Sequence, residues 1–84
     1  MGNAALIRRY VEENPHRPGP LHARLKESGV EIWALISYLY KAMHGDREAT
    51  ARDYDIPLDA VHAADAYYHQ HQDAIDGRIA ANVA

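Results

Sequence analysis

The 84-residue chain contains no cysteine, no phenylalanine and a single tryptophan. Without cysteine it can form no disulfide, thiolate metal site or thiolate nucleophile, which is typical of proteins in a reducing cytoplasm. No apolar run approaches the roughly 18 residues that a membrane-spanning helix needs. The N-terminus also lacks the apolar stretch of a signal peptide. These absences predict a cytoplasmic protein that does not contact a membrane.

Large apolar side chains are scarce as well. Hydrophobic residues make up 48% of the chain, but many of them are alanine, which buries little area. A chain of this length forms one domain at most and buries only about 60–65% of its unfolded surface. Such a thin core gains stability from a second chain. We therefore expect an oligomer, most simply a homodimer, or an obligate complex.

Positive charge is missing from a long stretch of the C-terminal half. Residues 53–76 hold six aspartates and no lysine or arginine, a balance of −6, whereas residues 1–26 hold five cations against two glutamates, a balance of +3. Dedicated nucleic-acid binders usually show a basic face, and only the N-terminal third can supply one here. The acidic half is better suited to a basic protein partner.

The N-terminal third has few clear signals of regular structure. Residues 4–13, "AALIRRYVEE", fit a short helix or a strand. Residues 14–20, "NPHRPGP", contain three prolines and a glycine, which exclude regular structure. Residues 20–28 can form a helix with Pro20 at its first position, ended by Ser28 and Gly29. We expect residues 1–29 to form a largely irregular N-terminal arm.

Residues 30–44, "VEIWALISYLYKAMH", are the strongest helix candidate. Apolar side chains at helical spacing form one stripe, with Trp33 and Tyr40 widening it. The stripe consists of Ile32, Leu35, Ile36, Leu39 and Met43. Gly45 is placed to end the helix. We predict that this helix supplies the core and the surface of a homodimer.

Residues 46–76 have the pattern of a helix-turn-helix. Asp46 is a good N-cap for the short helix "REATARDY", "DIP" makes the turn, and Pro57 opens a long helix that reaches Ile75. Asp55 stands where glycine often supplies a positive φ, which aspartate tolerates. The small and apolar positions that must pack together are Ala51, Tyr54, Ile56, Val61 and Ala64.

The predicted fold is therefore all-α. It is a small helical bundle in one domain, residues 1–84, with a helix-turn-helix-like core at residues 30–76. An irregular, proline-rich segment precedes that core. Residues 77–84 follow Gly77 as a continuation of the last helix or a fraying tail.

DNA reading is a separate question, because it needs Arg, Lys, Asn or Gln at the exposed start of the second helix. The positions expected to be exposed there are Leu58, Asp59, His62 and Asp65. Two of these are anionic and repel phosphate, so the pattern favours a helix-turn-helix used for packing. Any DNA contact would come from the neighbouring cations, which are Arg8, Arg9, Arg47 and Arg52.

Protein binding is the favoured use of the exposed residues. The adjacent tyrosines Tyr67 and Tyr68 point about 100° apart on a helix, so one enters the core and the other lies near its rim. A half-exposed tryptophan is a frequent interface anchor. The predicted protein-binding residues are Trp33, Tyr40, Asp59, Asp65, Tyr67 and Tyr68.

Metal binding and catalysis have weaker signals. His62, Asp65 and His69 share a helical face, and two histidines with a carboxylate can bind a divalent metal. A solvated face with an Asp65–His69 pair is the simpler interpretation, because no fourth ligand follows from the pattern. The chain has no glycine-rich phosphate loop, nucleophile elbow or recognisable pair of carboxylates. We therefore predict a non-enzymatic protein without a cofactor or metal.

Residues 30–76 contain a tryptophan helix, "VEIWALISYL", a centre, "GDREATARDYDIPLDAVHAADAYY", and the tail "HQDAID". In these motifs the chain resembles domain-of-unknown-function family 433, whose members are often described as VapB-like antitoxins. Residues 17–33, "RPGPLHARLKESGVEIW", depart from the family's usual N-terminal pattern.

The resemblance implies an antitoxin whose partner is a PIN-like ribonuclease toxin, and such antitoxins often repress their own promoter. Two alternatives stay open. The first is a DNA-binding transcriptional regulator that uses the helix-turn-helix. The second is a purely structural or assembly module.

Overall fold

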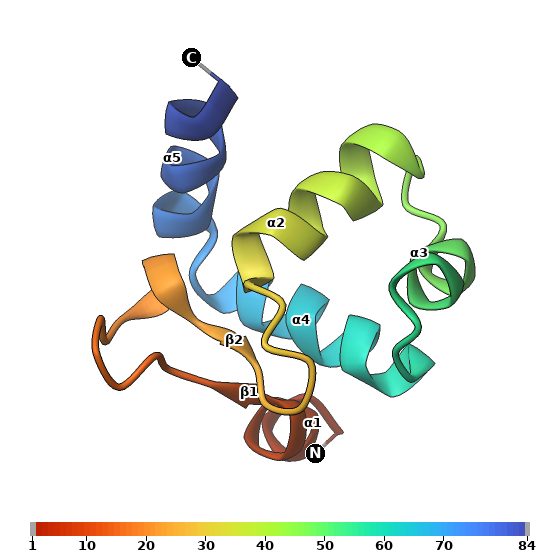
Figure 1. Ribbon diagram of the computed structural model, residues 1–84, viewed down its shortest axis with the longest axis horizontal. Coiled ribbons are helices and arrows are strands. Elements are labelled where there is room, and N and C mark those ends of the chain that lie inside the picture. Colours follow the sequence, from red (N-terminus) through yellow and green to blue (C-terminus); the bar gives the residue numbers. More distant parts are fainter. Residues whose placement is uncertain (1, 84) are drawn as a thin grey trace.

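The computed structural model describes residues 2–83, which are mostly helical (Figure 1). Five α-helices, two short strands and two shorter helical segments follow one another along the chain. They are α1 (Gly2–Tyr10), β1 (Val11–Glu12), the 3-10 helix η1 (Pro20–His22), β2 (Arg24–Leu25), α2 (Ile32–Ser37), the π-helix η2 (Tyr38–Ala42), α3 (Arg47–Tyr54), α4 (Leu58–Gln70) and α5 (Gln72–Val83). The predicted all-α fold, a small helical bundle, is confirmed.

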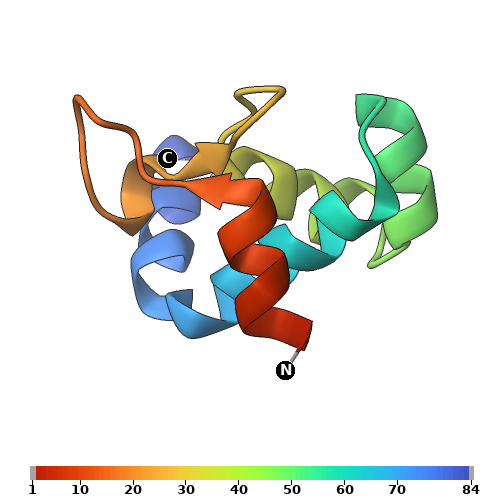
Figure 2. The same ribbon diagram turned by 90° about the horizontal axis from the view of Figure 1, so that it is seen from below.

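The N-terminal segment is folded onto the bundle and is not a free arm, which corrects one expectation. Residues 2–10 form α1, and this helix packs against α4 (Figure 2). Leu6, Ile7 and Tyr10 are half-buried against the core at helical spacing, which explains the choice of helix. The next two residues form β1, so both readings of "AALIRRYVEE" occur in succession. The proline-rich stretch between β1 and η1 is irregular, and a turn and loop follow β2 at residues 26–31.

The prediction of a helix at residues 20–28 was wrong beyond the first turn. Pro20 does open a helical turn, but Ala23 is already extended, with φ −61° and ψ 148°. The chain then enters β2, which pairs antiparallel with β1 and places Leu25 opposite Val11. Alternate side chains turn inward, since Ala23 is 0% and Leu25 only 3% exposed. Burial of these two side chains accounts for the extended conformation.

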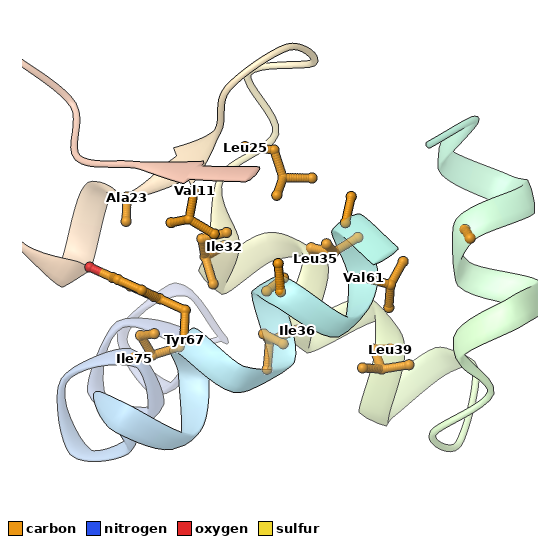
Figure 3. Close-up of a cluster of buried hydrophobic side chains, with 14 of the residues drawn as sticks. Val11, Ala23, Leu25, Ile32, Leu35, Ile36, Leu39, Val61, Tyr67 and Ile75 are labelled. Atoms are coloured by element: carbon orange, nitrogen blue, oxygen red, sulfur yellow. The ribbon is translucent and has the colours of Figure 1, made fainter. Parts of the chain in front are cut away.

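The predicted core helix is confirmed and carries the centre of the molecule. Ile32, Leu35 and Leu39 are fully buried and Ile36 is 2% exposed, and they face α4 and α5 (Figure 3). The last turn widens into the π-helix η2, where the Met43 amide donates to the Tyr38 carbonyl at 3.0 Å. Gly45, with φ +87°, ends the helix by donating to the Leu39 carbonyl at 2.8 Å.

The helix-turn-helix pattern is also confirmed. Asp46 caps α3 by accepting a hydrogen bond from the Ala49 amide at 3.0 Å. Asp55 adopts the left-handed conformation, with φ 56° and ψ 49°, at the turn between α3 and α4. Three of the predicted contact positions, Ala51, Val61 and Ala64, are buried, and Tyr54 and Ile56 pack against the same core.

The long helix expected from Pro57 to Ile75 is two helices. Pro57 caps α4, and the chain turns at His71, where φ is −130° and ψ is 37°. Helix α5 then returns against α2 with Ile75 and Ile79 buried. A straight continuation would carry these isoleucines away from the core, so their burial explains the turn. Residues 77–83 lie in α5, because the helix continues through Gly77.

Candidate functional site

The outer surface of the helix-turn-helix is the start of α4. Leu58 is 37% exposed, and Asp59 and His62 are exposed as well. Within residues 2–83, no ion pair includes Asp59. Its carboxylate lies in the first turn, where the positive end of the helix dipole stabilises an anion. This end of α4 therefore presents an apolar and an anionic side chain to solvent.

Asp65, predicted to lie on the same exposed face, is buried, and that expectation was wrong. It is only 8% exposed. The Arg47 Nη2 atom lies 2.6 Å from its Oδ2, and the Tyr40 hydroxyl donates to its Oδ1 at 2.6 Å. Arg47 comes from the start of α3 and Tyr40 from η2, so Asp65 joins three elements. The two donors cover and neutralise a carboxylate that helical periodicity alone places near solvent.

The pKa values of both donors to Asp65 are raised above their ordinary values. Burial, followed by the hydrogen bond to Asp65, raises the pKa of Tyr40 from 10.0 to about 12. The hydrogen bond to Asp65 also raises the pKa of the Arg47 guanidinium. His69 adds a longer contact, with its Nε2 atom 3.5 Å from Asp65 Oδ1. Tyr40, Arg47 and Asp65 thus form a hydrogen-bonded cluster that links η2, α3 and α4.

The two adjacent tyrosines divide between core and rim, as predicted. Tyr67 is 7% exposed, and its hydroxyl has no hydrogen-bond partner among the described residues. Tyr68 is half-buried, and its hydroxyl donates to Asp76 Oδ1 at 2.7 Å. Burial and that hydrogen bond raise the pKa of Tyr68 to about 12. Of the two, only Tyr68 has a surface that another protein can reach.

Trp33 is half-buried and already engaged within the chain. Its Nε1 atom donates to Glu31 Oε1 at 2.9 Å. The guanidinium carbon of Arg78 lies 4.2 Å from the centroid of the ring, in cation–π geometry. The sequence carried no signal for the Arg78 contact, because it depends on the turn at His71. These contacts fix the ring at the edge of the α2–α5 packing.

The four arginines considered for DNA contact have different surroundings. Arg8 and Arg9 are exposed at the end of α1, and Arg52 is exposed on α3. Arg47 is held by Asp65 and is therefore not free for phosphate. The Lys26 ammonium donates to the Arg8 carbonyl at 2.6 Å, which brings a further cation to the end of α1.

No arrangement of side chains for a metal is found in the described part of the chain. No group of three or more His, Cys, Asp or Glu residues within it is placed to hold an ion, although His69 does contact Asp65. Across residues 2–83, every helix is too short or too polar to traverse a lipid bilayer.

Comparison with known proteins adds no relative. No protein-family model, curated protein or solved structure matches the chain. The resemblance of residues 30–76 to antitoxins therefore stays a prediction.

Proposed function

We propose that this chain is a non-enzymatic antitoxin that binds and neutralises a PIN-like ribonuclease toxin. The observation that supports protein binding is the exposed start of α4, which presents Leu58 and Asp59, a carboxylate outside every ion pair of residues 2–83. An apolar side chain beside an anion suits a protein surface with a pocket and a neighbouring cation. The partner class comes from the resemblance. The proposal places the protein in the cytoplasm.

The same surface is poorly suited to reading DNA. A recognition helix inserts its N-terminal residues among base edges and between phosphates. Here that position carries Asp59, and Arg47 of α3 is bound to Asp65. Phosphate contact is left to Arg52 and to cations outside the helix-turn-helix. These charges support the proposal that α4 meets a protein.

A DNA-binding regulator is the second candidate, and one contact favours it. Lys26 is tied to the end of α1 beside the exposed Arg8 and Arg9, so three cations gather there. Such a cluster can supply backbone contacts, which are sensitive to salt. Autoregulation by an antitoxin would use the same residues. The two functions then occupy different surfaces of one molecule.

Self-association is part of the proposal, with a homodimer as its simplest form. The expected interface residues of the tryptophan helix are Trp33 and Tyr40. Both have polar contacts within the chain, and Tyr40 remains 38% exposed. A dimer through this helix would have to use the remaining exposed surface of the two rings.

Co-expression tests the proposed function. The tagged chain is co-expressed with the products of its neighbouring genes. Copurification measures complex formation, and growth of the co-expressing cells measures neutralisation. We expect a stable complex and restored growth of cells that otherwise arrest. Absence of a complex, together with sequence-specific DNA binding that disappears in an Arg8→Ala, Arg9→Ala double variant, would favour the regulator instead.

A further inference from the structure

A cavity of about 410 Å³ lies beside the turn of the helix-turn-helix. Its walls come from three segments: the end of α1, the loop that follows β2, and the turn between α3 and α4. Figure 2 shows these segments on the same side of the molecule. The volume falls in the range of roughly 300–1,000 Å³ that is usual for small-molecule sites.

The floor of the cavity is apolar. It is formed by the side chains of Tyr10, Leu25, Ile56, Pro57 and Ala60. Leu25 and Ala60 are almost fully buried, so the floor is part of the packed core and does not depend on mobile surface residues. An apolar group that enters the cavity gains contact with a preformed surface.

The rim carries charges of both signs. Arg9 and Lys26 contribute positive charge from the end of α1 and the β2 loop, and Glu27 and Asp55 contribute negative charge. In the part of the chain that the structure describes, none of these four side chains belongs to an ion pair. Opposite charges therefore line one cavity without neutralising one another.

Two of these charges are held by the backbone around them. Lys26 is fixed by its hydrogen bond of 2.6 Å to the Arg8 carbonyl. Asp55 occupies the left-handed position of the turn, so its placement follows from the geometry that starts α4. The guanidinium of Arg9 lies 5.4 Å from the centroid of the Tyr10 ring. Lys26 and Asp55 therefore place a positive and a negative charge at the rim in the absence of a ligand.

We propose that this cavity binds a small zwitterion with an apolar body, of which an α-amino acid with a large apolar side chain is the simplest example. The side chain lies on the apolar floor. The carboxylate meets Arg9 and Lys26, and the ammonium meets Asp55. Such a ligand would connect α1 and the β2 loop to the turn that orients α4. This inference does not rest on the proposed antitoxin function.

The test is a titration of the full-length ¹⁵N-labelled chain, followed by amide chemical shifts. L-leucine and L-phenylalanine are the zwitterionic probes. We expect at least one of them to cause saturable shifts among the lining residues, with a dissociation constant on the order of 1 mM, as suits a ligand with few atoms. N-acetyl-leucine lacks the ammonium and leucinamide lacks the carboxylate. Each should bind about fivefold more weakly or worse than leucine.

Charge-neutral variants test the two charged contacts, and matched variants outside the cavity serve as controls. Arg9→Gln and Asp55→Asn should each weaken binding by about fivefold or more, since each removes one charged contact while asparagine still tolerates the left-handed turn. Arg8→Gln and Asp59→Asn change exposed neighbours outside the cavity and should leave the affinity unchanged. Circular dichroism of all four variants establishes that each one is folded.

Three results would overturn the proposal. The first is the absence of saturable shifts with both amino acids. The second is equal affinity for the neutral probe N-acetyl-leucinamide, which would make the cavity an anchor site for an apolar side chain of a peptide. The third is equal affinity for leucine and a probe with a single charge, which would show that only one sign is recognised.

Discussion

The start and the middle of α4 each carry an aspartate, and the two have opposite surroundings. Asp59 is exposed and, within residues 2–83, belongs to no ion pair. Asp65, six residues further on, is 8% exposed and is bound by Arg47 and Tyr40. An exposed carboxylate is available to a partner, whereas one held by two donors is not. One helix thus carries a solvent-exposed carboxylate and a carboxylate that links three elements of the fold.

The free-energy cost of placing a carboxylate also differs between the two positions. A carboxylate removed from water loses several kcal/mol of hydration free energy, which only good pairing and hydrogen bonding offset. Asp65 obtains both from elements that are distant in sequence. Asp59 keeps its water and needs no partner within the chain. Substitutions at the two sites should consequently affect different properties.

The largest expected effect on stability is at Asp65. We expect Asp65→Ala to lower the free energy of unfolding by about 2–3 kcal/mol, because Arg47 loses its counter-charge and the Tyr40 hydroxyl its acceptor. Urea denaturation followed by circular dichroism measures this change. Asp59→Ala is the matched control and should cost about 0.5 kcal/mol, since it removes only a favourable charge near a helix N-terminus. Equal losses for the two variants would contradict the comparison.

The two arginines of α3 provide the next test. Arg47→Ala should destabilise the chain by about 1.5–2 kcal/mol, because it leaves the buried Asp65 without its cation. The effect is limited by the partial exposure of the Arg47 side chain, which is 36% accessible. Arg52→Ala, on the exposed side of the same helix, should change stability by about 0.5 kcal/mol or less. The same denaturation experiment distinguishes them.

Removal of single hydroxyl groups should have smaller effects. Tyr40→Phe deletes a donor to Asp65 and should cost about 1 kcal/mol. Tyr67→Phe deletes a buried hydroxyl that has no partner among the described residues, so it should be neutral or slightly stabilising. A larger loss for Tyr67→Phe than for Tyr40→Phe in thermal unfolding would show that the Tyr67 hydroxyl is satisfied in solution.

The raised pKa of Tyr40 adds a dependence on pH. Its value of about 12 in the folded chain lies above the ordinary value of 10.0, so the neutral phenol favours the folded state. This contribution is complete below pH 10 and is lost as pH rises towards 12. Tyr40→Phe should therefore lose less stability than the wild type over that interval. Unfolding experiments at pH 9, 10 and 11 measure the slope, and identical slopes would contradict the assignment.

The helix-turn-helix could be predicted from sequence because its determinants are local. Small and apolar residues recur at helical spacing across a proline-containing turn, and aspartate is among the few residues other than glycine that tolerate the positive φ of Asp55. This local pattern predicts Ala51, Val61 and Ala64 in the core, where the structure has them. The cap at Asp46 follows from the same local chemistry.

The features that sequence reasoning missed depend on distant contacts. Asp65 is buried by Tyr40 and Arg47, which are 25 and 18 residues away. The turn at His71 has no proline or glycine, and the burial of Ile75 and Ile79 against α2 accounts for it. Two strands of two residues each are too short to show a periodic pattern. In each case tertiary packing decided between local alternatives.

The most direct test is the affinity of the Asp59→Lys variant for the toxin partner that copurifies in the co-expression experiment. Isothermal titration calorimetry compares it with the wild type and with Asp73→Lys, a charge reversal at an exposed site of α5. We predict that Asp59→Lys weakens the complex at least tenfold, about 1.4 kcal/mol, while Asp73→Lys does not and both variants keep their helical circular dichroism. An affinity of Asp59→Lys equal to that of the wild type would show that the start of α4 is only a solvated surface.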